Sequence, residues 1–366
     1  MAETWRMVDT GVRPAAQNIA LNRAILESRQ ANEIPNTLRF LQFRPSALLG
    51  FHQSAEQELN LDYCHANNIE IQRRITGGGA IYMDSAQLGW ELYLAKQNLG
   101  SPDMQHVSKR ICEAAARGIE RLGIPAQYRP RNDIEVHGKK ISGTGGAYEG
   151  DALMFQGTLL IDFSIEKMLR VLRIPAEKLS DKAISAAKDR VTSLSELLTP
   201  IPALAHIKNC IKAAFAEEFD INFTPGVLCP QEESRFLVAL REISHTDWVH
   251  LVRSPSADMP LFHAMQKFAG GMLKVALSFD KKTNRIKQTW FSGDVFITPK
   301  RSLFDLESVL RDIPVEKLEA LIIQFFATNE VDMQGLTPQD FTSVVRAALS
   351  PVYPANPIGE PSECRK

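Results

Sequence analysis

The sequence predicts an α+β fold: a mixed, largely antiparallel sheet flanked by helices, followed by a smaller α+β domain. Hydrophobic residues make up 44% and charged residues 23% of the 366-residue chain, a balance typical of a globular protein with a substantial core. Strand-like and helix-like segments alternate irregularly, and most links between strands are too short for repeated βαβ crossovers. A chain of this length favours two domains.

The first part of the chain contains both kinds of element. Apolar residues at helical spacing predict helices over 16–29, 60–66, 104–122, 165–172 and 201–219. Apolar runs between turn residues predict strands over 38–43, 47–50, 70–73, 80–82, 88–94, 133–136, 139–144 and 153–163. His137 and Gly138 lie between two of these strands and are expected to form a hairpin turn.

Composition changes near residues 223–233, where Pro225, Gly226 and Pro230 cluster. We place the domain boundary there and expect a catalytic domain over 1–225, an accessory domain over 232–350 and a Pro-rich tail over 351–366. The accessory domain is expected to contain a helix over 233–241, strands over 272–279 and 286–297, and three short helices ending near Leu349.

Charge and cysteine usage limit the kinds of partner and compartment. Lys plus Arg number 42 and Asp plus Glu 43, so no net field attracts the chain to nucleic acid or an anionic membrane. We find neither an apolar run long enough to span a bilayer nor the layout of a signal peptide. The five scattered cysteines favour a reducing compartment. We therefore expect a cytoplasmic monomer without a structural metal site.

The first chemistry-bearing segment is Arg73–Tyr82, which contains three consecutive glycines after two arginines. Glycines let the backbone approach a ligand closely, and successive N–H groups can form an anion-binding nest. The segment lacks the P-loop pattern and does not open a helix as a Rossmann fingerprint does. The residues alone are compatible with a phosphate site or with a glycine-rich turn beside two surface arginines.

The second segment is Asn132–Gly146. Lys139 and Lys140 alternate in direction along a strand, so one can point inward while the other faces water. The carboxylate of Asp133 can hold a magnesium ion or a ribose hydroxyl. A solvated lysine pair on a plain hairpin is the alternative, although the dense Gly, Ser and Thr that follow are poor strand residues.

Together and in this order, the two segments resemble the lipoate–protein ligase A family, which carries RR-x-[ST]-GGGA-x-Y and then ND…G-[RK]-K-[IV]-SG-[ST]. Further matches to that family lie at 48–53, 155–160 and 190–194, and residues 247–248 and 267–293 resemble its accessory domain. Met83 and Gln87 depart from the family's usual histidine and asparagine. The resemblance implies a biotin/lipoate ligase-like catalytic domain with a C-terminal accessory domain.

Such ligases activate lipoate or octanoate with ATP and Mg²⁺ and pass the acyl group to a lysine of a lipoyl-carrier protein. The resemblance implies that Lys140 is the catalytic residue and contacts the acyl carbonyl and the α-phosphate. Asp133 is the implied magnesium ligand, and Gly77–Gly79 with Arg74 would hold phosphate oxygens. The implied ATP and acyl-adenylate site comprises Arg74, Thr76, Gly77, Gly78, Gly79, Ala80, Ile81, Tyr82, Asn132, Asp133, Lys140, Ser142, Gly143 and Thr144.

Other functions stay open at this point. Octanoyl transferases with this fold use a cysteine thioester without ATP, but residues 128–132, where one branch carries that cysteine, contain none. Cys112 and Cys210 are expected to be core residues, whereas Cys64 stays a candidate. Biotin ligases carry a GRGRxG loop that is absent here. A non-catalytic lipoyl-domain-binding protein is the remaining alternative. An apolar slot for the acyl chain has candidates in Leu48, Leu49 and Phe51, which core packing explains equally well.

Overall fold

The computed structural model describes residues 3–101, 103–130, 132–173, 188–252 and 258–350. The chain forms two compact units, Met1–Val252 and Arg253–Lys366. Helices of the first unit are α1 (Ala15–Gln30), α2 (Ala55–Glu58), α3 (Leu61–Ala66), α4 (Met104–Glu120), α5 (Ile165–Val171), α7 (Leu194–Leu197), α8 (Leu204–Phe219), α9 (Pro230–Ile243) and α10 (Thr246–Val249). Its strands are β1 (Glu3–Arg13), β2 (Thr37–Phe43), β3 (Ser46–Leu49), β4 (Glu70–Arg73), β5 (Ile81–Met83), β6 (Gln87–Ala95), β7 (Ala126–Arg129), β8 (Asp133–Val136), β9 (Lys139–Glu149), β10 (Ala152–Leu160) and β11 (Ile221–Pro225).

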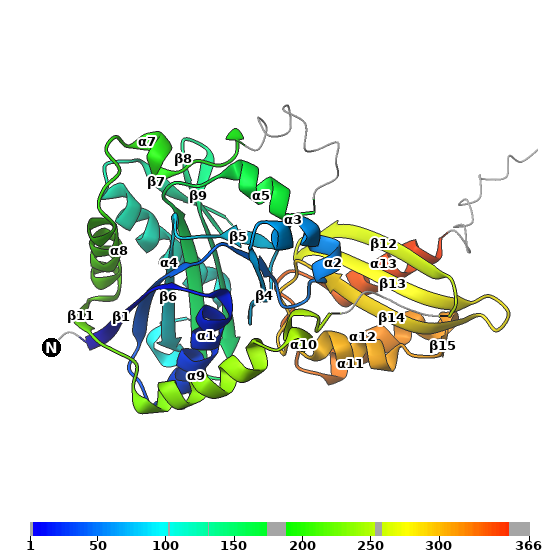
Figure 1. The fold of residues 1–366 in the computed structure, drawn as a ribbon. Coiled ribbons are helices and arrows are strands. Elements are labelled where there is room, and N and C mark those ends of the chain that lie inside the picture. Colours follow the sequence, from blue (N-terminus) through cyan, green and yellow to red (C-terminus); the bar gives the residue numbers. More distant parts are fainter. Residues whose placement is uncertain (1–2, 102, 131, 174–187, 253–257, 351–366) are drawn as a thin grey trace, which may run out of the picture. The chain divides into compact units, whose positions relative to one another are not determined.

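The first unit is built on an eight-stranded sheet with the order β11-β1-β2-β6-β10-β9-β8-β7. The pairs β1–β11 and β1–β2 are parallel and the others are antiparallel, so the predicted mixed, largely antiparallel sheet is confirmed. Helices α4 and α8 pack on one face, and α1 and α9 pack together on the other (Figure 1).

Alternation along β10 assigns its side chains to the two faces. Phe155 and Leu159 join the core beneath α4 and α8, whereas Met154 joins the core beneath α1. Gly157 lies on the α4 and α8 side, where a Cβ would come within 2.1 Å of the indole of Trp90. Gln156 and Thr158 therefore point to the opposite face.

A second, three-stranded sheet of the first unit has the order β4-β3-β5. Strand β3 pairs in parallel with β4, where Leu49 lies opposite Arg73, and antiparallel with β5, where Leu48 lies opposite Ile81. The glycine segment is the connection between β4 and β5. The small sheet therefore holds both ends of this segment.

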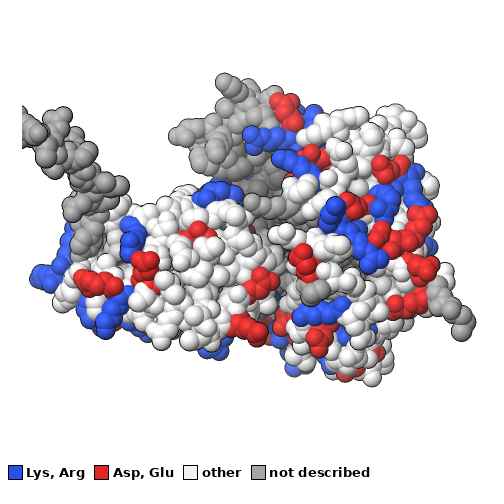
Figure 2. Space-filling view, turned by 180° about the vertical axis from the view of Figure 1, so that it is seen from behind, with Lys and Arg blue, Asp and Glu red and all other residues white. Residues whose placement is uncertain are grey.

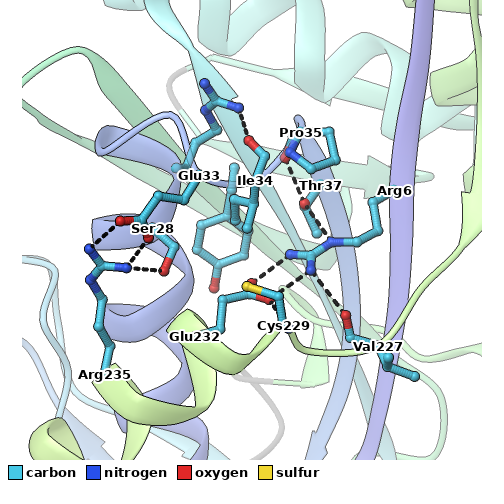
Figure 3. A network of polar contacts seen from close by, with 12 residues as sticks. Arg6, Ser28, Glu33, Ile34, Pro35, Thr37, Val227, Cys229, Glu232 and Arg235 are labelled. Atoms are coloured by element: carbon cyan, nitrogen blue, oxygen red, sulfur yellow. Dashed lines mark hydrogen bonds and ion pairs between the residues drawn. The ribbon is translucent and has the colours of Figure 1, made fainter.

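Helix α9 belongs to the first unit, which moves the division between units from the predicted 225–232 to Val252. Both oxygens of the fully buried Glu232 accept from the guanidinium of Arg6 on β1, at 2.6 and 2.7 Å (Figure 3). On the same helix, Arg235 donates to Ser28 of α1 at 2.9 Å and pairs with Glu33 (Figure 3). The Pro and Gly cluster that favoured a boundary is instead a turn that leads into a docked helix.

The second unit has a four-stranded sheet with the order β12-β13-β14-β15. Its strands are β12 (Leu261–Phe268), β13 (Gly271–Asp280), β14 (Arg285–Gly293) and β15 (Ile313–Pro314), and its main helices are α11 (Ser302–Val309), α12 (Leu318–Thr328) and α13 (Pro338–Leu349). Strand β14 ends at Gly293, which pairs with Leu273 of β13, and is therefore shorter than the predicted strand to residue 297. The predicted tail over 351–366 lies outside the described residues.

The surface carries both signs of charge side by side. Figure 2 shows Lys and Arg interspersed with Asp and Glu over the face that it draws. This distribution agrees with the formal net charge of −1. Across the described residues, no helix is both long and apolar enough to traverse a lipid bilayer.

Candidate active site

Lys140 lies at the start of β9, immediately after the predicted hairpin turn. The turn is confirmed: His137 and Gly138 have φ of 51° and 77°, the two positive values of a type I′ turn. A bulge then shifts the register between β8 and β9 from Ile134 opposite Ser142 to Glu135 opposite Lys140. Bulges redirect side chains and are common beside active sites.

The backbone of Lys140 is held on two sides. Besides pairing with β8, its N–H donates to the carbonyl of Arg190 at 2.8 Å, and its carbonyl accepts from Thr192 at 2.9 Å. Its ammonium lies 2.6 Å from Oδ1 of Asp133, and its side chain is 39% exposed. The lysine therefore starts from a rigid backbone position and keeps an ammonium that a ligand can reach.

The residues after Lys140 complete this part of the site. A Cβ on Gly143 would meet Cε and Nζ of Lys140 at 3.0 Å, so the lysine side chain folds across this glycine. Ser142 is buried, and its hydroxyl has no hydrogen-bond partner among the described residues. Thr144 donates to the carbonyl of Asn132 at 2.9 Å, and Asn132 donates back to Thr144 at 3.1 Å.

The predicted glycine loop, residues 76–80, packs against a glycine from an earlier motif. Gly78 has φ 95°, a left-handed conformation that favours glycine. A Cβ on Gly50 would lie 1.8 Å from the carbonyl oxygen of Gly78. Phe51 donates its backbone N–H to the carbonyl of Thr76 at 2.9 Å. Residues 50–51 therefore form the support on which the loop rests.

The two arginines before the loop are buried, contrary to the surface alternative. Arg74 donates to the carbonyls of Leu48, Gly77 and Gly79 at 3.0, 3.3 and 2.8 Å, and burial lowers its pKa to about 10. Its guanidinium thus braces the loop from inside, and its predicted contact with phosphate stays a prediction. Arg73 is fully buried, and its guanidinium donates to the backbone carbonyls of Gly50 and Val249.

Strand β10 connects the two motifs. Gln156 donates to Oγ1 of Thr76 in the glycine loop at 3.2 Å. Thr158, two residues later and hence on the same face, lies 3.4 Å from the backbone N and O of Gly143, beneath Lys140. The lysine and the glycine loop therefore occupy the same face of the large sheet. In the sequence, Gln156 and Thr158 are recognisable as two polar residues at alternate positions of an otherwise apolar strand.

The end of the loop continues into β5. Ala80 and Ile81 are partly buried, whereas Tyr82 is buried and donates to Oδ2 of Asp84 at 3.0 Å. Burial, reinforced by the neighbouring Asp84 carboxylate, raises the pKa of the Tyr82 hydroxyl. Its hydroxyl is committed to this contact, so any ligand beside β5 would meet mainly backbone.

Three candidates for an acyl slot are core residues. Leu48 packs with the cluster beneath α1, Leu49 packs with the cluster around α3, and Phe51 is 8% exposed. This burial supports the packing interpretation of all three residues.

Burial makes Cys64, Cys112 and Cys210 poor nucleophiles. Cys112 lies nearest the lysine hairpin, with Sγ 3.2 Å from Oγ1 of Thr144. Burial raises the pKa of Cys112 and of Cys64 to about 11, and it also raises the pKa of Cys210. A thiol with such a pKa is almost entirely protonated at neutral pH.

Within the described ranges, no three His, Cys, Asp or Glu side chains gather to hold a metal ion. Asp133 supplies one carboxylate beside Lys140. Mg²⁺ that arrives with a nucleotide is commonly bound by one or two carboxylates together with phosphate oxygens. A single carboxylate is compatible with an ion that arrives with a nucleotide.

Comparison with known proteins identifies the family of the chain. The family described as lipoyl protein ligase A/B catalytic domain matches residues 14–216, more than half of the chain. Lipoate-protein ligase A subunit 1 from Thermoplasma acidophilum is 28% identical over 227 residues, 59% of this chain and 84% of that protein. The octanoyltransferase LipM of Symbiobacterium thermophilum is 26% identical over 256 residues, 64% of this chain and 93% of that protein.

A similar fold is found in a chain from the structural analysis of a bi-partite lipoate protein ligase and its E2 lipoyl domain from Thermoplasma acidophilum. The solved chain is 26% identical to this one, and the two superpose with a TM-score of 0.63. The match covers 70% of this chain and 100% of the solved chain. The relatives include both ligases and octanoyltransferases, so similarity alone supports an enzyme of one of these two kinds. Because the family match spans both motifs and the strands that join them, the chain belongs to the lipoyl protein ligase A/B catalytic domain family.

Proposed function

We propose that the chain is a lipoate–protein ligase that uses ATP to form lipoyl-AMP and transfers the lipoyl group to a lysine of a lipoyl-carrier protein. The observation that carries the proposal is the placement of the Lys140 ammonium on the sheet face that also holds the glycine loop. The chain is similar to a lipoate-protein ligase subunit over 84% of that protein. It is also similar to an octanoyltransferase, which is the second candidate.

In the first step, a carboxylate oxygen of lipoate attacks the α-phosphorus of ATP. The new bond is the acyl–phosphate bond of lipoyl-AMP, and the bond to the β-phosphate breaks to release pyrophosphate. Both reactants are anionic, so a cation between them lowers the barrier and stabilises the charge of the transition state. The ammonium of Lys140 takes this role, and Asp133 orients it through their 2.6 Å ion pair.

The glycine loop binds phosphate through its backbone. Gly78 adopts φ 95°, and the flanking residues lack a bulky side chain that would keep an anion away from the N–H groups. Arg74 holds the carbonyls of Gly77 and Gly79 on its own side of the loop. This arrangement favours loop N–H groups that point away from Arg74. Magnesium bound with the nucleotide would screen phosphate charge, with Asp133 as its protein ligand.

In the second step, the neutral amine of the carrier lysine attacks the acyl carbonyl of lipoyl-AMP. An amide bond forms, the acyl–phosphate bond breaks, AMP leaves and the amine loses its proton. Lys140 contacts the same carbonyl oxygen and stabilises the negative charge that develops there. Its positive charge also disfavours protonation of the incoming amine by like-charge repulsion.

Burial of Cys112 supports the ligase over the transferase. A transferase must form a thioester on a cysteine near the site, but Cys112 is buried and its pKa is raised to about 11. Residues 128–132, just before the lysine hairpin, contain no cysteine. The acyl group is therefore expected to be carried by AMP rather than by sulfur.

A donor comparison tests the proposal. The chain is incubated with a lipoyl domain and either lipoate plus ATP or octanoyl-loaded acyl-carrier protein without ATP. The ligase releases pyrophosphate and increases the mass of the lipoyl domain only in the first mixture. Domain labelling from the carrier without ATP would instead establish the transferase. No labelling in either mixture would leave a non-catalytic binding protein.

A further inference from the structure

The segment after α9 lies outside the family match over 14–216 but contacts the base of the glycine loop. Trp248 on α10 donates its indole N–H to the carbonyl of Arg73 at 3.0 Å. Arg73 returns this contact, with Nε 3.0 Å from the carbonyl of Trp248 and Nη2 2.6 Å from that of Val249. Gln72 also donates to the carbonyl of Ile243 at 3.0 Å. Strand β4 is thereby hydrogen-bonded to the end of the first unit.

The remaining guanidinium nitrogen of Arg73 holds the support beneath the loop. Nη1 lies 3.0, 2.8 and 2.6 Å from the carbonyls of Gly50, Phe51 and Gln53. The ring of Phe51 meets that of Trp248 edge to face, with centroids 6.0 Å apart. Arg73 is fully buried, so these carbonyls cannot be replaced by water without exposing its charge.

The turn held by Arg73 touches the glycine loop directly. Gly50 abuts the carbonyl of Gly78, and Phe51 donates to Thr76. Arg74, the next residue after Arg73, bonds the carbonyls of Gly77 and Gly79. A shift of Trp248 would therefore move Arg73, the 50–53 turn and the glycine loop together.

We propose that Trp248 is a positioning residue for nucleotide binding: it fixes Arg73 and thereby the conformation of the glycine loop. The proposal rests on the proposed function, because it assigns ATP to that loop. It also means that the catalytic unit of this chain extends through α10 and is incomplete if it ends with the family match at 216.

Trp248→Phe in the full chain tests this role, since it keeps an aromatic ring but removes the indole N–H. We expect the KM for ATP to rise about fivefold, the effect of one neutral hydrogen bond, while the KM for lipoate stays unchanged. Trp248→Ala, which also loses the contact with Phe51, should raise the KM for ATP further. Trp5→Phe is the matched control: Trp5 is 1% exposed and packs against the tilted ring of Phe219 in the core on the α4 and α8 side.

Hydrogen–deuterium exchange of the ligand-free chain provides the second measurement. Trp248→Phe should accelerate exchange of the loop amides at 76–80, and Trp5→Phe should not. Faster loop exchange together with a higher KM for ATP supports the proposal. Unchanged loop exchange would overturn it, as would equal effects of both variants on the KM for ATP. If the native chain does not use ATP, the proposed function is wrong, and the exchange result still decides whether Trp248 positions the loop.

Discussion

A methyl group at position 50 should displace the glycine loop. A Cβ on Gly50 would lie 1.8 Å from the carbonyl oxygen and 2.9 Å from the carbonyl carbon of Gly78. Ordinary contact begins near 3.4 Å, so the two backbones must separate by about 1.5 Å. The φ of Gly50 is not among the positive values, so the substitution acts through this overlap and not through backbone strain.

A displacement of this size is large for catalysis. Misplacement of reacting groups by about 1 Å can cost about 100-fold in rate. We therefore expect Gly50→Ala to lower kcat/KM for ATP about 100-fold in a pyrophosphate-release assay. The overpacking should also lower the free energy of unfolding by about 1–3 kcal/mol, measured by urea denaturation.

Gly118→Ala separates the two effects. Gly118 lies on α4, where a Cβ would come within 2.8 Å of the Cα of Ile211 on α8. This contact is in the core on the opposite face of the sheet from the glycine loop. Gly118→Ala should change stability while keeping the KM for ATP. If Gly50→Ala kept a native kcat/KM for ATP, the glycine loop would not be the phosphate site.

Two further predictions concern buried titratable groups. Cys112→Ala should retain ATP-dependent labelling of a lipoyl domain, because the pKa of this buried thiol is raised to about 11 and the thiol is protonated at neutral pH. If the variant kept native stability but lost all labelling, a thioester on Cys112 would be favoured instead. Burial raises the pKa of Glu307 from 4.5 to about 7, so folding takes up a proton and stability falls as pH rises between these values. Glu307→Gln should remove this loss and stabilise the chain by about 1–2 kcal/mol at pH 8, after allowance for partial exposure. Urea denaturation of the native chain and of Glu307→Gln at pH 5 and pH 8 measures this difference in the free energy of unfolding. An equal pH dependence of the two proteins would contradict the raised pKa of Glu307.

Local patterns predicted most elements around the site. The apolar stripe of α4, the strands of the lysine hairpin and its His137-Gly138 turn follow from residues that are adjacent in sequence. Strand β1 was not predicted because its burial depends on distant partners. Trp5 enters the core on one face, and Arg6 on the other is neutralised by Glu232, more than 200 residues away.

The environment of the motif residues depends on the same long-range contacts. Two arginines before a glycine run indicate phosphate binding or a solvated surface, yet the guanidinium groups of Arg73 and Arg74 are buried and donate to backbone carbonyls from three segments. The steric role of Gly50 and the link from Gln156 to Thr76 arise from packing of β3 and β10 against the loop. Residue types at the site were thus predictable, whereas the contacts that position them were not.

The boundary between the units differs from the predicted one because it, too, depends on long-range contacts. Pro230 was one of the residues that placed the predicted domain boundary, but it occupies the first turn of α9, where proline is favoured. Glu232, three residues after Cys229, accepts from the Cys229 N–H at 2.7 Å and completes the cap. The helix was predicted over 233–241, whereas its cap at Cys229 and the packing of α9 on α1 were not.

A paired substitution at the lysine hairpin tests the central claim most directly. Lys139 and Lys140 are neighbours on β9, opposite Val136 and Glu135, and only Lys140 folds across Gly143 and pairs with Asp133 in the described structure. The assay is lipoate-dependent exchange of labelled pyrophosphate into ATP, which reports the adenylation step alone. Lys140→Met should reduce exchange about 100- to 1,000-fold, the effect of removing a charge-stabilising donor, while Lys139→Met stays close to the native rate. Native exchange by Lys140→Met would contradict the account.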